Sequence, residues 1–187
     1  MKPLRIFNPV TKTILLALML SITSLLVAQN VTSAAISERL KVVKSHAALA
    51  EDDAATLKSY AFSRLSWESH SARVSLMKEH INALIKDYND LAEMRPDAVP
   101  WQQEAIDRIE PLVRETADQL TALIEHMNQN QSRLHMKPYR DYVNAHYKVV
   151  SNLHKVIADF VDYGEAKEQK EAMERELALP TTASAEK

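Results

Sequence analysis

Apolar residues recur at alternating steps of four and three along most of the chain, a spacing that places them on one face of an α-helix. The first such run consists of Ile36, Leu40, Val43, Ala47, Ala50, Ala54, Leu57 and Ala61. The second has a different phase and consists of Trp67, His70, Val74, Met77, Ile81, Leu84, Tyr88 and Leu91. The phase changes within residues 62–66, and Ser66 is suited to be the N-cap of a new helix. We therefore predict a turn there rather than at Asp52 and Asp53, because the first run continues unbroken across those acids.

Two more runs of the same kind follow a predicted loop over residues 95–100, where Pro96 and Pro100 disfavour helix in the residues before them. The third run consists of Ala105, Ile109, Leu112, Thr116, Leu120, Leu123 and Met127, and Pro111 within it predicts a kink. The polar residues 128–132 should end this helix, and Pro138 suits the first turn of the next. The fourth run consists of Tyr139, Tyr142, His146, Val150, Leu153, Ile157 and Phe160.

These four runs, each about 25 residues long and joined by short loops, predict an all-α protein with an up-down-up-down four-helix bundle over residues 36–164. Beyond Gly164 the sequence is charged on most faces. We expect residues 165–187 to form a solvated helical extension followed by a disordered tail from Pro180.

The N-terminal region has the pattern of an export signal. Its first 35 residues carry three basic residues and no acid, and an apolar run covers residues 14–28. This run is shorter than the roughly 20 residues that a spanning helix needs, so a signal peptide over residues 1–35 is the preferred interpretation. Cleavage after Ala28 or after Ala35 fits equally well. We therefore expect a periplasmic or extracellular protein; the alternative is an uncleaved anchor in the inner membrane formed by residues 14–28.

Composition and charge exclude several classes of function. The chain of 187 residues has one glycine and no cysteine, which leaves no P-loop, dinucleotide-binding turn, nucleophile elbow, thiolate metal site or lipoprotein anchor. Without the leader it has 20 basic and 25 acidic residues, a net charge of −5. A basic surface for nucleic acid is therefore not expected.

The bundle topology gathers histidines and aromatic residues at the end where the first helix leads into the second and the third into the fourth. His70 and His146 fall on the apolar stripes there, and Met127 lies nearby, which suggests a haem or transition-metal site. The preferred interpretation is an aromatic plug in which each imidazole is hydrogen-bonded to a neighbour, with no cofactor bound. The acids Glu51, Asp52 and Asp53 are interpreted as a solvated helix face rather than a cation site.

Several segments together resemble a pattern in uncharacterised exported all-helical proteins of bacteria. They are the sequence WESHSA over residues 67–72, the sequence PWQQEAID over residues 100–107, and the aromatic residues Tyr139, Tyr142, Phe160 and Tyr163. The resemblance implies an exported helical bundle and no particular activity.

The sequence shows no catalytic constellation: no Glu-x-x-His pair of a di-iron bundle and no spacing typical of a nucleophile site. We therefore expect a non-enzymatic, exported or envelope-associated protein that binds a protein partner or itself. The alternative is a bundle that binds haem or a transition metal through His70 and His146.

Overall fold

The computed structural model describes the backbone of residues 9–177 and the side chains of residues 32–177. Four long helices follow one another: α1 (Pro9–Ala61), α2 (Trp67–Glu93), α3 (Pro100–Gln129) and α4 (Lys137–Glu176). Short 3₁₀ turns, η1 (Arg95–Asp97) and η2 (Gln131–Arg133), lie in the α2–α3 and α3–α4 connections. Over the residues that the structure describes there is no β-strand, so the predicted all-α class is confirmed.

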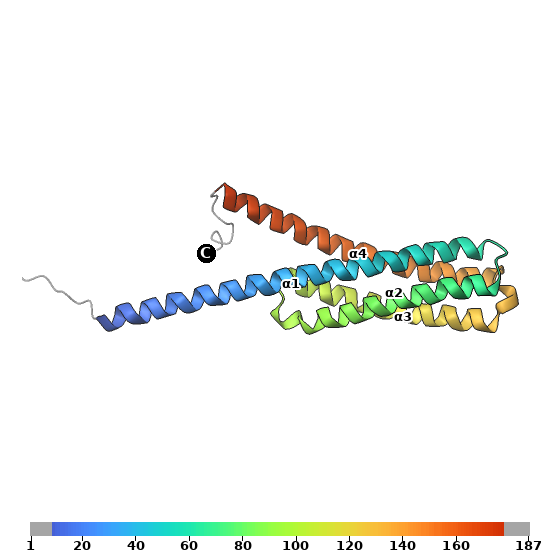
Figure 1. Cartoon of the computed structure of the whole chain (residues 1–187), viewed down its shortest axis with the longest axis horizontal. Helices are drawn as coiled ribbons and strands as arrows, with labels where there is room; N and C mark the ends of the chain where they lie inside the picture. The colour runs from blue at the N-terminus through green and yellow to red at the C-terminus, as the bar shows by residue number, and fades with distance from the viewer. Residues whose placement is uncertain (1–8, 178–187) are drawn as a thin grey trace, which may run out of the picture.

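Consecutive helices run antiparallel and form the predicted up-down-up-down bundle (Figure 1). The helix α1 packs against both α2 and α4, and α3 packs against α4. The α1–α2 and α3–α4 connections lie at one end of the bundle, and the α2–α3 connection lies at the other end. Side chains from three or four helices therefore meet at each end.

The first helix is longer than the predicted stripe, because α1 is continuous from Pro9 to Ala61 over 53 residues. The side chains of the predicted leader run, residues 14–28, lie outside the described residues, as do residues 1–8 and the predicted disordered tail. Among the described residues, none of the helices is both long enough and apolar enough to cross a membrane.

The apolar stripes form the core as predicted along α1 and α2, where every predicted position except the half-buried Trp67 is buried. The prediction of a buried side chain is wrong at three positions on α3 and α4. Leu112 and Phe160 are half-buried and Tyr142 is 39% exposed, while the next residue in each case, Val113, Val161 or Val143, is buried. The reason is that a straight helix has 3.6 residues per turn, so the buried face drifts away from a strict alternation of three and four.

The predicted helix boundaries follow from local chemistry. The Ser66 side chain accepts a hydrogen bond from the Ser69 N–H and caps α2, while Pro100 and Pro138 occupy the first turns of α3 and α4. Pro111 lies inside α3, which continues without interruption on both sides of it. The kink at this residue stays a prediction.

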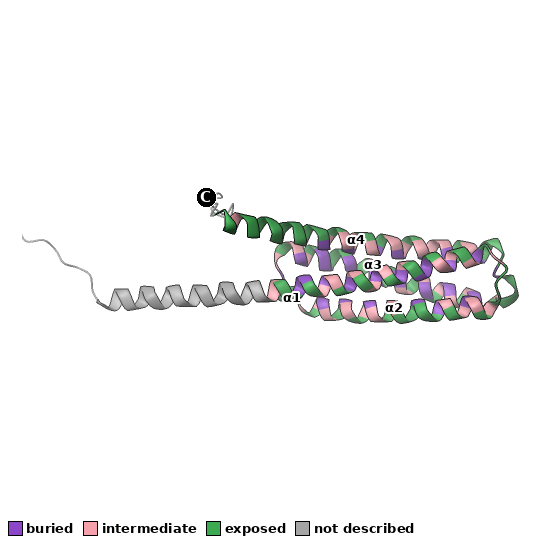
Figure 2. Ribbon diagram, turned by 45° about the horizontal axis from the view of Figure 1, so that its top comes forward, coloured by how far each residue is buried: buried purple, intermediate pink, exposed green. Residues whose placement is uncertain are grey.

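The last part of α4 leaves the bundle. The buried stripe of this helix ends at Val161 and Gly164, and the same face continues with Glu168, Glu171 and Arg175, which have nothing apolar to bury. Residues 165–173 are all exposed, and this end of α4 diverges from α1 and projects beyond the α2–α3 connection (Figures 1 and 2). The expected charged extension is thus helical through Glu176.

The stripes predict how stability responds to truncation of core side chains. Leu84 and Leu123 are fully buried, so replacing either with Ala should lower the free energy of unfolding by about 2–5 kcal/mol. Asp52 is exposed, and Asp52→Ala should change it by less than about 0.5 kcal/mol. Urea unfolding measures all three variants, and equal effects at buried and exposed positions would contradict the assignment of the stripes.

Candidate functional site

Five aromatic rings from all four helices form a continuous cluster at the end of the bundle with the α1–α2 and α3–α4 connections. Tyr142 stacks on His126 with ring centroids 4.5 Å apart, and His126 in turn lies 6.4 Å from Tyr139. Tyr139 and Tyr60 each meet His70 edge-on, at 5.3 Å and 5.8 Å. The bundle topology predicts that histidines and aromatic residues gather at this end, and the ring contacts confirm that prediction.

The centre of this cluster is a buried hydrogen bond between two neutral groups. The Nδ1 atom of His70 lies 2.9 Å from the Tyr139 hydroxyl, and 1% or less of either residue is exposed. Burial lowers the pKa of His70 and raises that of the Tyr139 phenol, so neither group ionises readily. A satisfied neutral pair of this kind is what the aromatic-plug interpretation predicted for His70.

His146 departs from that interpretation. It is 1% exposed and follows Val143 and precedes Val150 on the buried face of α4. In the described part of the chain neither of its ring nitrogens has a hydrogen-bond partner. The prediction that each imidazole at this end is hydrogen-bonded is therefore wrong for His146. Burial lowers its pKa to about 4, because it takes the charged imidazolium out of solvent.

The predicted ligand set His70, His146 and Met127 is buried as a whole, and Met127 and Tyr139 belong to the same apolar cluster. His70 has one ring nitrogen engaged by Tyr139, so only its Nε2 could bind a metal without breaking that hydrogen bond. Over the described residues no group of three or more His, Asp or Glu side chains could hold a metal ion. A metal at this end would thus depend on two imidazoles and a thioether.

The acids of α1 form a second polar site, which the sequence did not predict. Asp53 is only 3% exposed; it accepts a hydrogen bond from Arg73 Nη1 at 2.7 Å, and its other oxygen lies 2.6 Å from Nδ1 of His80. The hydrogen bond to Asp53 raises the pKa of Arg73. The interpretation of residues 51–53 as a solvated face is therefore wrong for Asp53, since both of its partners lie on α2.

Glu51 makes the matching contact on the other side of α1. Its carboxylate lies 2.6 Å from Nδ1 of His154 on α4. Burial raises the pKa of the Glu51 carboxyl, but hydrogen bonds from Ser151 and His154 outweigh it and leave the pKa below its usual value. His46 adds a third contact of this type, with Nδ1 2.8 Å from Asp87 although outside hydrogen-bond geometry. Histidine–carboxylate contacts thus connect α1 to both neighbouring helices.

The opposite end of the bundle holds the sequence PWQQEAID at the start of α3. Gln102 is fully buried, and its amide donates to the Ser33 carbonyl at 2.8 Å and to the Ser37 hydroxyl at 3.2 Å. Trp101 packs against α4 at Gly164, where a Cβ would lie 2.7 Å from the indole ring. The single glycine is therefore explained by the close approach of Trp101, a contact that the sequence pattern did not reveal.

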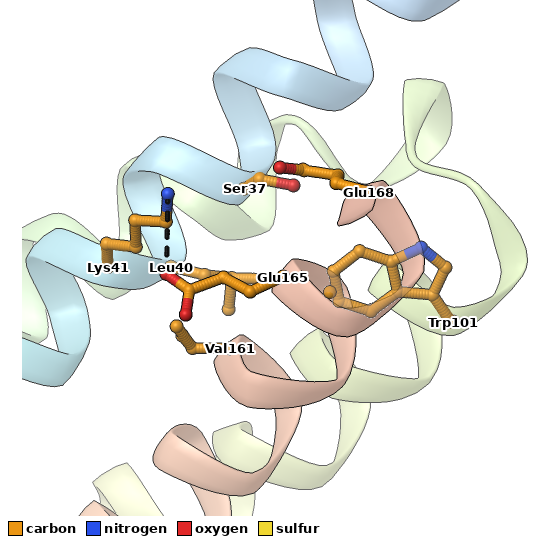
Figure 3. Close-up of a pocket in the computed structure, with 8 residues that line it drawn as sticks. Ser37, Leu40, Lys41, Trp101, Val161, Glu165 and Glu168 are labelled. Atoms are coloured by element: carbon orange, nitrogen blue, oxygen red, sulfur yellow. Dashed lines mark ion pairs between the residues drawn. The ribbon is translucent and has the colours of Figure 1, made fainter. Parts of the chain in front are cut away.

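The ends of α1 and α4 separate just beyond this contact. Lys41 on α1 lies 3.6 Å from Glu165 on α4 (Figure 3). The gap between them, also lined by Trp101 and Glu168, measures about 10 Å³, no more than a single water molecule needs. Beneath the diverging helices the packing is thus nearly complete.

No protein-family model, curated protein or solved structure matches this chain.

Because Asp53 is buried, removing its charge should strongly lower the stability of the fold. Asp53→Asn should lower the free energy of unfolding by about 3–5 kcal/mol, because Arg73 would keep its charge in a half-buried site without a counter-charge. Glu110→Gln removes a carboxylate from an exposed pair with Arg114 and should cost less than about 0.5 kcal/mol. Chemical denaturation compares the two, and a cost below 1 kcal/mol for Asp53→Asn would contradict the assigned role.

His146 predicts a loss of stability in mild acid. Its pKa is about 4 in the folded chain and near 6.5 when unfolded, so the unfolded chain binds the extra proton between these values. The contribution of neutral His146 to the free energy of unfolding is fully present above pH 6.5. It should fall by about 3 kcal/mol as the pH drops to 4. His146→Leu should remove this part of the pH dependence, as measured by urea unfolding between pH 4 and 7.

The matched control is His135, which is exposed: His135→Gln should leave the pH profile unchanged. An unaltered profile in His146→Leu would show that His146 is not the titrating group. The lowered pKa of His70 acts in the same direction, so some pH dependence should persist in the variant.

Proposed function

We propose that this chain is a non-enzymatic exported protein that binds a protein partner, or a second copy of itself, through the projecting end of α4. The observation that carries the proposal is the continuous helix beyond Gly164, whose residues 165–173 are exposed. Isolated helices of about 12 residues are marginal in water. A helix that extends this far without packing gains stability from a partner.

The projecting segment has the side chains that such a contact needs. Tyr163, Met173 and Leu177 are 54%, 50% and 66% exposed, and with Ala166 they follow the spacing of a single helix face. Lys170 lies on the same face and pairs with Glu174, and Lys167 pairs with Glu171 alongside it. Apolar side chains interspersed with charged pairs on one face are typical of helices that pack against another helix.

Export is the second part of the proposal, and it rests on the basic and apolar pattern of the first 35 residues. Cell fractionation with N-terminal analysis tests it. Soluble periplasmic protein that begins near Gln29 or Ile36 supports export and cleavage, whereas membrane-bound protein with Met1 intact supports the anchor formed by residues 14–28.

A photo-crosslinking amino acid at Leu177 tests the interaction in intact cells. We expect discrete adducts from this position and none from Leu76, which is 44% exposed on α2 and serves as the control. Met173→Glu should abolish the adducts, because it places a charge in the apolar stripe. Adducts with the purified chain alone would identify self-association, and equal adducts from both positions, or none, would overturn the proposal.

The haem or metal alternative rests on His70 and His146 at the histidine-rich end, and on the two ring nitrogens of His146, which have no hydrogen-bond partner among the described residues. Our preferred interpretation expects purified protein to be colourless, and its melting temperature to be unaffected by haem, zinc or copper. A shift of several degrees that disappears in both His70→Gln and His146→Leu would favour the alternative, since a bound ligand stabilises by an amount that depends on its affinity.

A further inference from the structure

A groove on the outer side of the α3–α4 pair combines aromatic rings with acidic side chains. It encloses about 270 Å³ and is lined by Trp101, Glu104, Arg108, Val156, Asp159, Phe160 and Tyr163. Trp101, Val156 and Phe160 are half-buried against the core, so the two aromatic rings are held in place from beneath. The groove is distinct from the Tyr163–Leu177 stripe except for Tyr163, which borders both.

The two most prominent rings form a corner. Trp101 and Tyr163 meet with their centroids 5.6 Å apart and their planes inclined by 65°, and the close fit of Trp101 against Gly164 fixes the indole. Phe160 lies one turn before Tyr163 on α4 and contributes a third ring. Several aromatic faces around a small space are the arrangement that attracts an organic cation, because each ring face carries partial negative charge.

The charges of the groove favour the same type of ligand. Glu104 makes no ion pair within the part of the chain that the structure describes, and Asp159 is paired with Lys155 at 2.6 Å. Arg108 places its guanidinium 5.4 Å from the centre of the Phe160 ring. The groove thus already holds one cation of its own over Phe160, while the corner formed by Trp101 and Tyr163 has none among the described residues.

We infer that this groove is a binding site for a quaternary ammonium group, held against Trp101 and Tyr163 with Glu104 as its counter-charge. A trimethylammonium group is weakly hydrated and apolar on its surface, so it loses little solvation when it enters an aromatic corner. The same chemistry occurs in free choline-like solutes and in the headgroup of phosphatidylcholine, and the experiment distinguishes these two sources.

The fluorescence of Trp101 provides the measurement. The chain has two tryptophans, and Trp67 begins α2 at the other end of the bundle, so Trp67→Phe leaves Trp101 as the only reporter. Choline should change its fluorescence saturably, whereas 3,3-dimethylbutan-1-ol, which has the same shape without the charge, should not. Calorimetric titration of the unmodified chain provides the second measurement if Trp67→Phe impairs folding.

Substitutions in the groove should change the affinity in opposite directions. Tyr163→Leu and Glu104→Gln should each weaken choline binding about tenfold, as loss of a ring face or of the counter-charge implies. Arg108→Gln should strengthen it, because a competing cation is removed. Glu115→Gln is the matched control: it removes the same charge from an exposed position farther along α3 and should leave the affinity unchanged.

Vesicles identify the source of the ammonium group. Binding to phosphatidylcholine vesicles but not to phosphatidylglycerol vesicles assigns the groove to a lipid headgroup, and binding of choline without vesicle binding assigns it to a free solute. Equal responses to choline and its neutral isostere, or no saturable response to choline and no preference between the vesicles, would overturn the inference. The crosslinking test at Leu177 is independent of either result.

Discussion

The packing of four apolar stripes determines where each polar group of this protein can lie. Side chains at steps of three and four residues bury one face of every helix, from Ile36 on α1 to Val161 on α4. Small residues on α1, among them Ala47, Ala50 and Ala54, leave space for larger side chains from the facing helices. Where the stripe stops being apolar, at Glu168, the helix continues but the bundle ends.

Polar groups inside this frame are tolerated only in pairs or in a neutral form. Asp53 is buried because Arg73 and His80 supply its hydrogen-bonding partners, and His70 is buried because Tyr139 supplies one. His146 has no such partner among the described residues and instead stays neutral through a lowered pKa. We therefore expect His146 to contribute to the acid sensitivity of the fold together with His70, whose pKa burial also lowers.

The fold could be predicted from the sequence because periodicity, prolines and the Ser66 cap are local signals. The polar contacts could not, because their partners lie on other helices. Asp53 is 20 residues from Arg73 and Glu51 is 103 residues from His154, and the spacing of acids along α1 alone gives no sign of either pair. The role of Gly164 could not be predicted for the same reason, because it depends on the Trp101 ring, which approaches from α3.

The two ends of the bundle differ in what they can offer to a ligand or partner. At the end with the α1–α2 and α3–α4 connections the central rings are buried and hydrogen-bonded, so binding there would require an existing interaction to break. At the other end, Trp101 and Phe160 are anchored in the core yet partly exposed, and Tyr163 is 54% exposed. Rigid aromatic side chains that remain accessible lose little conformational entropy on binding. This end, where α4 leaves the bundle, therefore has both the pre-organised groove and the free helix face.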